Sequence, residues 1–266
     1  MARPKFRVIA CEQGSEEWFR ARAGVITASM FTTARSRTGG LDERQQRYVW
    51  AIRGGKSEAE ARELGGFKAQ PTSDTVRRAI EGEVVGMPSS QSLNYAFRLA
   101  IERISGEPLD EGHSTWQMER GQELEPEARA EHQIQSGMMV DRAGFVVSNC
   151  GRFGASADGL IEDDGGSEYK CLVSPERLRT ILIDGDWSDF RDQVQGCMWL
   201  TGRAWWHLGF YCPQLRAIDY PLHVIEVRRD EAYIADLHKD LLQFNAVVES
   251  NVKKLRKLAQ REDATA

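Results

Sequence analysis

Residues 156–172, with the sequence SADGLIEDDGGSEYKCL, contain two strand-forming segments separated by a cluster of turn-forming residues. The central EDDGG is rich in Asp and Gly, the residues that tight turns favour. We therefore predict an antiparallel β-hairpin that brings Asp158 beside Glu168. Because successive side chains of a strand point to opposite faces, Lys170 shares the face of Glu168 and Tyr169 points to the other. A chain with this hairpin must contain at least one β-sheet with charged side chains on one face.

The acids of this hairpin are flanked by apolar residues, Leu160, Ile161, Tyr169 and Leu172. The flanking pattern predicts a partly buried sheet, in which a carboxylate needs a compensating interaction. Two neighbouring carboxylates both stay ionised near neutral pH only when a cation lies between them, and oxygen ligands favour Mg²⁺ or Mn²⁺. Such an ion would activate a water and stabilise negative charge, with the lysine orienting or deprotonating that water or neutralising charge at the pentavalent phosphorus. The pattern fits phosphodiester hydrolysis, and a ladder of surface charges is the alternative.

Composition narrows the class of protein. The chain has 266 residues and a net charge of −5, and it contains no apolar run of the length that spans a membrane. The N-terminus lacks the apolar segment of a signal peptide, and the five cysteines are widely scattered, so we expect reduced thiols and a cytoplasmic protein. The acidic balance argues weakly against nucleic-acid binding, but local charge decides such binding. Local basic features are Arg20, Arg22, Arg35, Arg37 and the tail KKLRKLAQR, for each of which a solvated face is the alternative.

Hydrophobic periodicity in the rest of the chain predicts an α/β fold with a small, mixed, partly antiparallel sheet flanked by helices. Strands are expected at residues 7–11, 138–148, 152–162, 167–173, 204–212 and 221–229, with turns at Asp141–Gly144, Asn149–Gly151 and Asp163–Gly166. Helices are expected at residues 15–24, 27–35, 89–108, 115–137, 188–202 and 230–261, with an interruption of the fourth near Gly121 and Pro126. Ser15 is the expected N-cap of the first helix, and Thr27 or Ser29 lies at the start of the second.

The segment from residue 41 to about residue 86 has a different character. It reads as three short helices, with Ser57 as the expected N-cap of the second and Ser73 or Thr72 as that of the third. Two short helices joined by a tight Gly-containing turn are typical of a helix-turn-helix. The stretches QQRYVWAI, EAEARELGGF and TVRRAIEG resemble the small DNA-binding module of phage terminase small subunits. A helical insertion with a structural role is the alternative.

Four blocks of sequence resemble one family of nucleases. The spacing D-x9-E-Y-K from Asp158 to Lys170 resembles the PD-(D/E)xK nuclease signature, with Ala157 in place of the proline. Residues 12–29, 121–129 and 192–211 are similar to the other motifs of lambda-type phage exonucleases, the YqaJ-like viral recombinases. The blocks occur in family order. The resemblance implies a PD-(D/E)xK nuclease core, with residues 1–266 forming a single nuclease domain that carries the 41–86 insertion.

The resemblance also implies a role for each matching residue of the hairpin. Asp158 and Glu168, with the main-chain carbonyl of Tyr169, would bind Mg²⁺, for which Mn²⁺ would substitute. Lys170 would act on the nucleophilic water. Glu125 matches the acid of the second motif and would lie next to the metal, and a glutamate on an exposed helix surface is the alternative reading of its position.

Other matching residues lie outside the hairpin. Gln193 matches the first glutamine of the last motif and would reach the active site. Residues two apart on a helix point about 200° away from each other, so Gln195 is expected to be structural. Arg22 and Ser29 match the pair that binds the 5′-terminal phosphate in the family, since a guanidinium and a hydroxyl at a helix N-terminus suit a phosphate. Trp18, in the same motif, is expected to pack in the core.

The implied activity is Mg²⁺-dependent 5′→3′ digestion of one strand of linear double-stranded DNA in phage-type recombination. The products would be mononucleotides and a 3′ overhang. Family members form ring-shaped trimers and work with a single-strand annealing protein, so the resemblance implies both partners, in the cytoplasm of a bacterial host. The alternatives are a related nuclease of other polarity or with endonuclease action, as in RecB-like enzymes, and a DNA-binding protein whose helical insertion is the main DNA contact.

Overall fold

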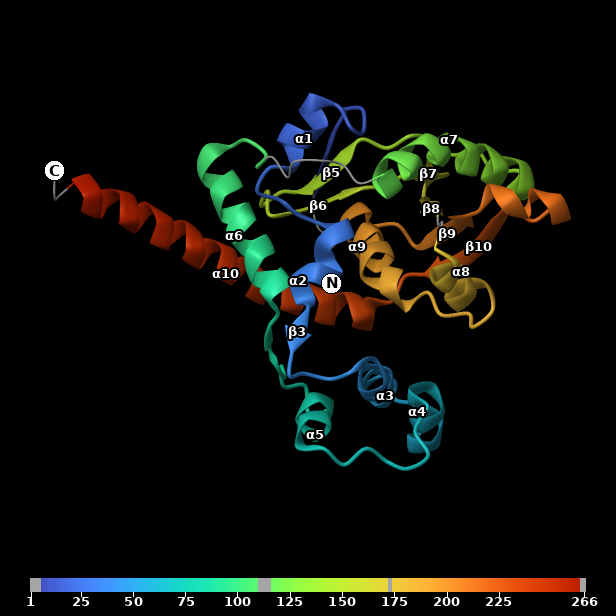
Figure 1. Ribbon diagram of the computed structural model, residues 1–266, viewed down its shortest axis with the longest axis horizontal. Helices are drawn as coiled ribbons and strands as arrows, with labels where there is room; N and C mark the ends of the chain where they lie inside the picture. Colours follow the sequence, from blue (N-terminus) through green and yellow to red (C-terminus); the bar gives the residue numbers. More distant parts are fainter. Residues whose placement is uncertain (1–5, 110–115, 172–173, 264–266) are drawn as a thin grey trace. The chain divides into compact units, whose positions relative to one another are not determined.

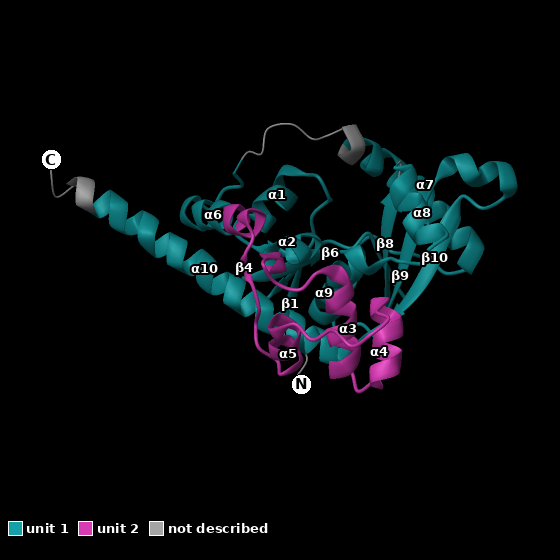
Figure 2. Ribbon diagram, turned by 60° about the horizontal axis from the view of Figure 1, so that its bottom comes forward, with its two compact units in different colours: residues 1–34, 96–266 teal, residues 35–95 magenta. Residues whose placement is uncertain are grey.

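The computed structural model describes residues 6–109, 116–171 and 174–263 (Figure 1). The chain divides into two compact units, one formed by residues 1–34 and 96–266 and the other by residues 35–95 (Figure 2). None of the helices in the described ranges combines the length and the apolar composition that crossing a membrane requires.

The first sheet of the larger unit has the strand order β1-β5-β6-β2. Its strands are β1 (Phe6–Ile9), β5 (Phe145–Ser148), β6 (Phe153–Ser156) and β2 (Ile26–Thr27). Neighbours are antiparallel except that β2 runs parallel to β6. The sheet therefore joins the N-terminal segment to strands that lie more than a hundred residues later in the chain.

The second sheet has the order β10-β9-β8-β7 and contains the predicted hairpin. Its strands are β10 (Leu222–Arg228), β9 (Trp205–Tyr211), β8 (Gly165–Cys171) and β7 (Gly159–Ile161). The pair β8–β9 is parallel and the other two pairs are antiparallel, so this is the mixed sheet that the sequence predicts. The strands form two sheets rather than one because the chain leaves the ladder between the end of β6 and the start of β7.

The turn of the hairpin differs from its prediction. The turn residues are 162–164, and Gly165 and Gly166 lie inside β8. A Cβ atom on Gly165 would lie 2.1 Å from the indole ring of Trp205, and one on Gly166 would lie 2.3 Å from that of Trp206. The glycines therefore permit close packing against β9 instead of forming the turn itself.

Two helices cover opposite faces of the second sheet: α7 (Trp116–Ser136) and α9 (Arg191–Thr201). Helix α7 packs Leu124 and Ala128 against the face that carries Tyr169. The predicted interruption of this helix near Gly121 and Pro126 is wrong, because α7 is continuous and includes Pro126. Pro126 is exposed, so the carbonyl that loses its hydrogen bond is near solvent while packing of the apolar side chains holds the helix.

The larger unit also contains other helical segments, of which Figure 1 labels α1, α8 and α10: α1 (Glu16–Arg22), η1 (Ala28–Met30), α8 (Pro175–Leu182), η2 (Ser188–Phe190), η3 (Pro213–Ile218) and α10 (Glu231–Asp263). Helices α2 (Phe31–Arg35) and α6 (Ser90–Ser105) continue into the smaller unit. Ser15 caps α1 as expected, accepting a hydrogen bond from the Trp18 N–H at 3.2 Å. The segments α8 and η3 were not predicted from the sequence.

Two predicted boundaries agree with the structure in part. The expected helix at residues 27–35 begins as the 3₁₀ turn η1 and continues as α2, and the Thr27 side chain makes no capping hydrogen bond. The expected turn at Asp141–Gly144 directly precedes β5, but residues 138–140 before it belong to no strand, and Asp141 forms an isolated bridge to Leu160. Tertiary pairing rather than local propensity decides the backbone conformation there.

The smaller unit contains three helices and a short ribbon: α3 (Glu43–Arg53), α4 (Glu58–Gly65), α5 (Asp74–Ile80), β3 (Arg37–Thr38) and β4 (Met87–Pro88). Ser57 caps α4 as predicted, accepting from the Glu60 N–H, and of the two candidates for α5 it is Ser73 that accepts from the Val76 N–H. The three helices share a small apolar core that includes Tyr48 and Val76. The role of this unit in DNA binding stays a prediction.

Candidate active site

The predicted hairpin places Asp158 next to Glu168 in the second sheet. Gly159 pairs with Ser167 across the β7–β8 ladder, so Asp158 and Glu168 are the next residues outward on the two chains. The backbone N–H of Tyr169 donates a hydrogen bond of 2.7 Å to Oδ2 of Asp158. Because the N–H and C=O of one strand residue point to the same edge, the Tyr169 carbonyl also faces the side where Asp158 lies. Both carboxylates are buried, at 7% and 4% exposure.

Lys170 and Gln193 hold the Glu168 carboxylate from one side. The Lys170 ammonium lies 2.8 Å from Oε1 of Glu168 and 2.9 Å from Oε1 of Gln193. Gln193 Nε2 donates to the same Glu168 oxygen at 2.5 Å. Gln193 comes from the first turn of α9, so this helix covers the face that Glu168 and Lys170 share, as strand alternation predicts. Gln195 is not part of this contact, since its amide bonds the backbone of Arg228 and Asp230 at 2.9 Å each.

Glu125 reaches the same region from α7 through an arginine that sequence reasoning missed. Arg129 lies one helical turn after Glu125 and forms an ion pair with it. The same guanidinium nitrogen donates a 2.8 Å hydrogen bond to the backbone carbonyl of Asp158. The i,i+4 spacing of these two residues within GQELEPEAR is the signal that indicates their pairing. Arg129 thus connects α7 to Asp158, which lies between β6 of the first sheet and β7 of the second.

The electrostatics of this cluster favour a bound cation. Burial, followed by the nearby charges of Glu168 and Glu125, raises the pKa of Asp158 well above its ordinary range. Burial also raises the pKa of Glu125, against the opposing charge of Arg129. For Lys170, burial lowers the pKa, but the charges of Glu168 and Asp158 outweigh it and the net pKa is raised. The cluster therefore gathers more negative charge than Lys170 balances.

The available oxygens fit a hard divalent ion. The second oxygen of Glu168, Oε2, is buried and has no hydrogen-bond partner. Asp158, Glu168 and the Tyr169 carbonyl would supply the all-oxygen donor set that Mg²⁺ and Mn²⁺ prefer. Within the described ranges, no group of three or more His, Cys, Asp or Glu side chains is arranged to hold a metal ion.

A buried chain of hydrogen bonds supports Tyr169 from the other face of the sheet. The Tyr169 hydroxyl lies 2.8 Å from Nδ1 of His132, and His132 Nε2 lies 2.8 Å from Nδ1 of His207. His207 Nε2 in turn lies 3.8 Å from Glu226. Two neutral histidines satisfy this chain when the tyrosine donates to His132 and His132 donates to His207. The side chain of Tyr169 is thereby anchored, and its backbone N–H holds Asp158.

This network predicts a loss of stability in acid. Burial, and then the neighbouring His207, lower the pKa of His132 from 6.5 to about 4. The unfolded chain therefore takes up a proton at a higher pH than the folded one, so the stabilisation is complete above pH 6.5 and is lost as the pH falls toward 4. We expect the free energy of unfolding of the native protein to fall by about 3 kcal/mol more than that of a His132→Gln variant over this window. Urea titrations at both ends of the window measure the difference, and equal losses would contradict it.

Arg22 and Ser29 lie near the start of the first sheet. The Arg22 guanidinium stacks over the Trp18 ring, with 3.9 Å from its central carbon to the ring centroid. Trp18 is buried as predicted and donates from Nε1 to the Ser156 hydroxyl at 2.8 Å. Ser29 is exposed in the middle of η1, which continues directly into α2, so Ser29 lies in the first turn of a helical segment as expected, and that turn is 3₁₀ rather than α. The segment forms a 3₁₀ turn because it leaves β2 directly to pack against α9.

Helix α9 links the Ser29 segment to the hairpin. Gly196 lies on α9, and a Cβ atom there would come within 2.5 Å of the Phe31 ring. The absence of a side chain at Gly196 lets the residues after Ser29 approach the same helix that carries Gln193. The predicted phosphate-binding segment and the carboxylate pair are therefore both supported by α9.

Comparison with known proteins agrees with this arrangement. Residues 17–204, well over half of the chain, match the YqaJ-like viral recombinase domain. The chain belongs to this family. The assignment confirms the family that the four sequence blocks indicated. A search of curated proteins found no match.

Solved structures extend the family likeness to the whole fold. The chain is similar to LHK-Exo in complex with dAMP, with 27% identity and a TM-score of 0.67 over 93% of this chain and 99% of that one. A second structure, an alkaline exonuclease (LHK-Exo) from Laribacter hongkongensis, gives 25% identity and a TM-score of 0.66 with the same coverage. A phage-related exonuclease from Haemophilus somnus 129PT shares the fold at 12% identity and a TM-score of 0.50, covering 84% and 99% of the chains. The predicted PD-(D/E)xK-type α/β fold is confirmed.

Proposed function

We propose that this chain is a divalent-metal-dependent exonuclease that degrades the 5′-ended strand of linear double-stranded DNA. The observation that carries the proposal is the buried pair Asp158 and Glu168, held beside the Lys170 ammonium in the mixed sheet. The likeness to an alkaline exonuclease supports exonuclease action, and its complex with dAMP is consistent with release of mononucleotides.

The side chains of the cluster have separate tasks in this proposal. Asp158, Glu168 and the Tyr169 carbonyl would hold Mg²⁺ or Mn²⁺. When bound, such an ion lowers the pKa of a water and offsets negative charge on the phosphate. Lys170, kept charged by its acidic neighbours, orients the water and donates to an oxygen of the reacting phosphate.

Three further residues complete the arrangement. Gln193 accepts a hydrogen bond from Lys170 and donates one to Glu168, and so limits the motion of both side chains. Glu125, whose pKa is raised by burial, accepts a proton more readily than an ordinary glutamate. Arg129 positions Glu125 relative to the Asp158 backbone.

The direction of digestion is tested with linear blunt duplex labelled at one 5′ end or one 3′ end. In the presence of Mg²⁺, we expect the 5′ label to appear at once as mononucleotide, while the 3′ label stays on a long single strand. The reverse order of release would contradict the proposed polarity. Cutting of closed circular DNA at a similar rate would contradict exonuclease action altogether.

Arg22 and Ser29 are expected to bind the 5′-terminal phosphate of the DNA. An Arg22→Gln variant should lose about 10–100-fold in kcat/KM on 5′-phosphorylated duplex, because a charge-assisted contact to a dianion contributes about 1.5–3 kcal/mol. The same variant should lose little on duplex with a 5′-hydroxyl. Arg20→Gln on the same helix is the matched control, since Arg20 is exposed and paired with Glu16. A loss of equal size on both substrates would exclude phosphate recognition by Arg22.

The partners follow from the family resemblance. We propose that the chain acts on double-stranded DNA ends in the cytoplasm of a bacterial host, as a ring-shaped trimer, together with a single-strand annealing protein. Light scattering of the purified chain measures the assembly directly. The helical segment at residues 41–86 would be an insertion in the nuclease domain, and DNA contact is the role we propose for it.

A further inference from the structure

The last turns of α10 gather basic side chains that lack acidic partners. Lys253, Lys254, Arg256 and Lys257 are all exposed, and no acidic residue lies between Asn251 and Gln260. Throughout the described ranges, none of these four side chains takes part in an ion pair. The nearest acid before them, Glu249, is already paired with Arg103 and Arg152.

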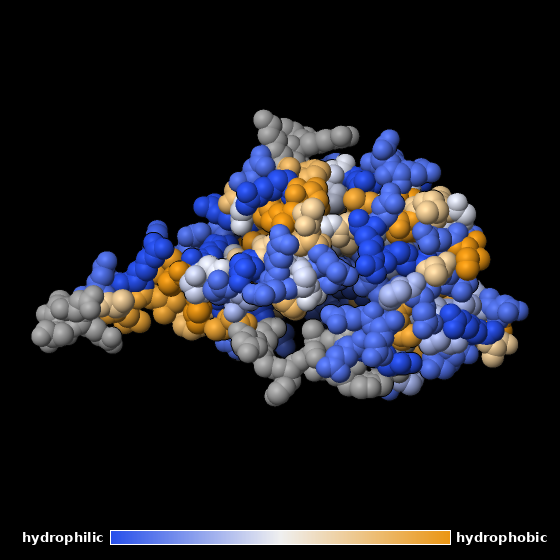
Figure 3. Space-filling model, turned by 90° about the horizontal axis from the view of Figure 1, so that it is seen from above, coloured by the Kyte–Doolittle hydropathy of each residue, from blue (hydrophilic) through white to orange (hydrophobic). Residues whose placement is uncertain are grey.

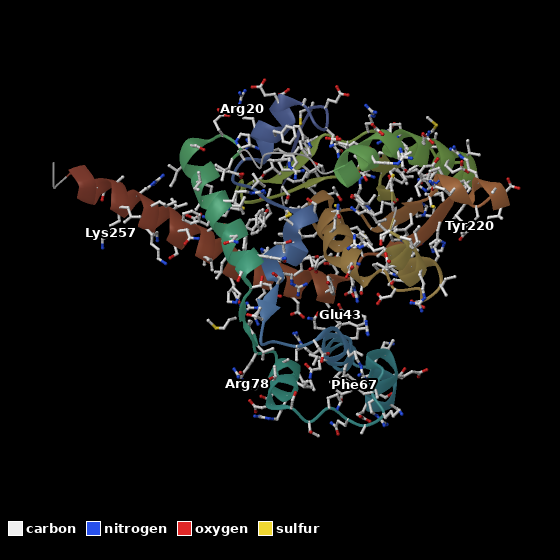
Figure 4. All side chains as sticks on the ribbon, in the orientation of Figure 1. Arg20, Glu43, Phe67, Arg78, Tyr220 and Lys257 are labelled. Carbon is white, nitrogen blue, oxygen red and sulfur yellow. The ribbon has the colours of Figure 1, made fainter. Side chains whose placement is uncertain are left out.

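The basic side chains share one face of the helix. At 100° per residue, the four span about 160° of the helix circumference and rise about 6 Å along its axis. The opposite face carries Val252, which is buried, Leu255, which is half-buried, and Leu258. Figure 3 shows hydrophilic and hydrophobic residues on opposite sides of this end of α10, and Figure 4 labels Lys257 on it.

Four exposed arginines elsewhere in the larger unit differ from these side chains. Arginines on α8, β10 and the loop before β5 are paired with nearby acids. A paired arginine offers little net charge to a ligand, whereas four unpaired cations on one face create a local positive potential in a chain of net charge −5.

We propose that this basic face, formed by Lys253, Lys254, Arg256 and Lys257, binds the phosphate backbone of double-stranded DNA. The proposal rests on the proposed function, which supplies the duplex as substrate. Duplex DNA carries one negative charge per about 1.7 Å of its axis, so 6 Å of helix faces about three to four phosphates. Such contacts carry no base information and would hold the duplex whatever its sequence.

A membrane surface fits the same face less well. Helices that lie on membranes present Trp, Phe or Leu on a broad apolar face. The segment from Val252 to Gln260 contains no aromatic residue, and Leu258 is its one exposed large apolar side chain, at 57% exposure. The apolar area therefore does not provide the burial that membrane binding needs.

The test compares salt dependence of duplex binding in two variants of equal net charge. In the first, Lys253, Lys254, Arg256 and Lys257 are all replaced by Gln, a residue that keeps helix propensity high. In the second, four exposed and ion-paired arginines are replaced by Gln: Arg142, Arg177, Arg179 and Arg228. Fluorescence anisotropy with a blunt-ended duplex measures Kd over a series of KCl concentrations, in EDTA so that no metal is present to support digestion.

We expect the slope of log Kd against log salt to fall by about 2–4 in the first variant and by less than about 1 in the second. Single Lys257→Gln and Lys253→Gln variants, each expected to lower the slope by about 0.9, keep the test valid if the fourfold variant does not fold. Equal slopes in native protein and first variant would overturn the proposal. So would loss of binding to anionic phospholipid vesicles in the first variant while its DNA slope is unchanged.

Measuring duplex binding and hydrolysis separately distinguishes a failure of the basic-face proposal from a failure of the proposed exonuclease function. A chain that binds duplex through the basic face but never digests it would contradict the exonuclease and leave the binding face intact. A chain that digests duplex from its ends with an unchanged salt slope in the first variant would contradict the binding face alone.

Discussion

An Asp158→Asn variant is expected to lose at least about 1,000-fold in the rate of DNA hydrolysis while it folds and binds duplex normally. The carboxylate is one of two acids that would hold the metal, and an amide oxygen carries no charge to bind it. The amide can still accept the hydrogen bond that the Tyr169 N–H now gives to Asp158 at 2.7 Å. Initial rates with labelled linear duplex, under single-turnover conditions, measure the change.

The stability of this variant separates a catalytic role from a structural one. Burial, Glu168 and Glu125 raise the pKa of Asp158, so its ionised form makes the folded state less stable as the pH rises. Removing the charge should leave the Tm near neutral pH unchanged or raise it. Asp163→Asn, in the exposed turn of the same hairpin, is the matched control and should retain full activity. A variant that unfolds, or one that keeps its activity, would show that Asp158 has another role.

Lys170→Met is the second change with a large expected effect. Removing the ammonium should slow hydrolysis by about 100–10,000-fold, because it takes away the only cation that contacts both Glu168 and Gln193 in the described site. The variant should also lose about 1–3 kcal/mol of stability, since a buried carboxylate keeps a single amide partner. Single-turnover rates and urea titration measure the two effects.

Lys170→Arg distinguishes charge from geometry. A planar guanidinium keeps the charge but cannot occupy the position of an ammonium that lies 2.8 Å from Glu168 and 2.9 Å from Gln193. We therefore expect stability to recover and activity to stay low. Arg179→Met, at an exposed ion pair on α8, should change neither quantity by much. Full activity in Lys170→Arg would show that a positive charge alone suffices.

The local elements of the site could be predicted because each has a short-range signal. Strand alternation places Glu168 and Lys170 on one face and Tyr169 on the other, and the contacts with Gln193 and His132 agree. Capping residues mark helices in the same way, as Ser15 and Ser57 show. Such patterns depend on residues that lie within a few positions of each other in the sequence.

The features that could not be predicted from the sequence depend on contacts between residues far apart in the chain. The split into two sheets depends on β1 pairing with β5, across more than a hundred residues. The place of Gly165 and Gly166 depends on Trp205 and Trp206, and the reach of Arg129 to the Asp158 carbonyl depends on how α7 lies on the sheet. None of these contacts produces a periodic pattern in the sequence, so they can be identified only from the folded structure.

The most direct measurement is a crystal structure grown with Mn²⁺, with anomalous scattering collected at its absorption edge. The account predicts an anomalous peak within coordination distance of the Asp158 carboxylate, the Glu168 carboxylate and the Tyr169 carbonyl. It also predicts that the peak disappears in Asp158→Asn. Mn²⁺ bound elsewhere, with these three groups free of it, would contradict the metal site and the hydrolysis derived from it.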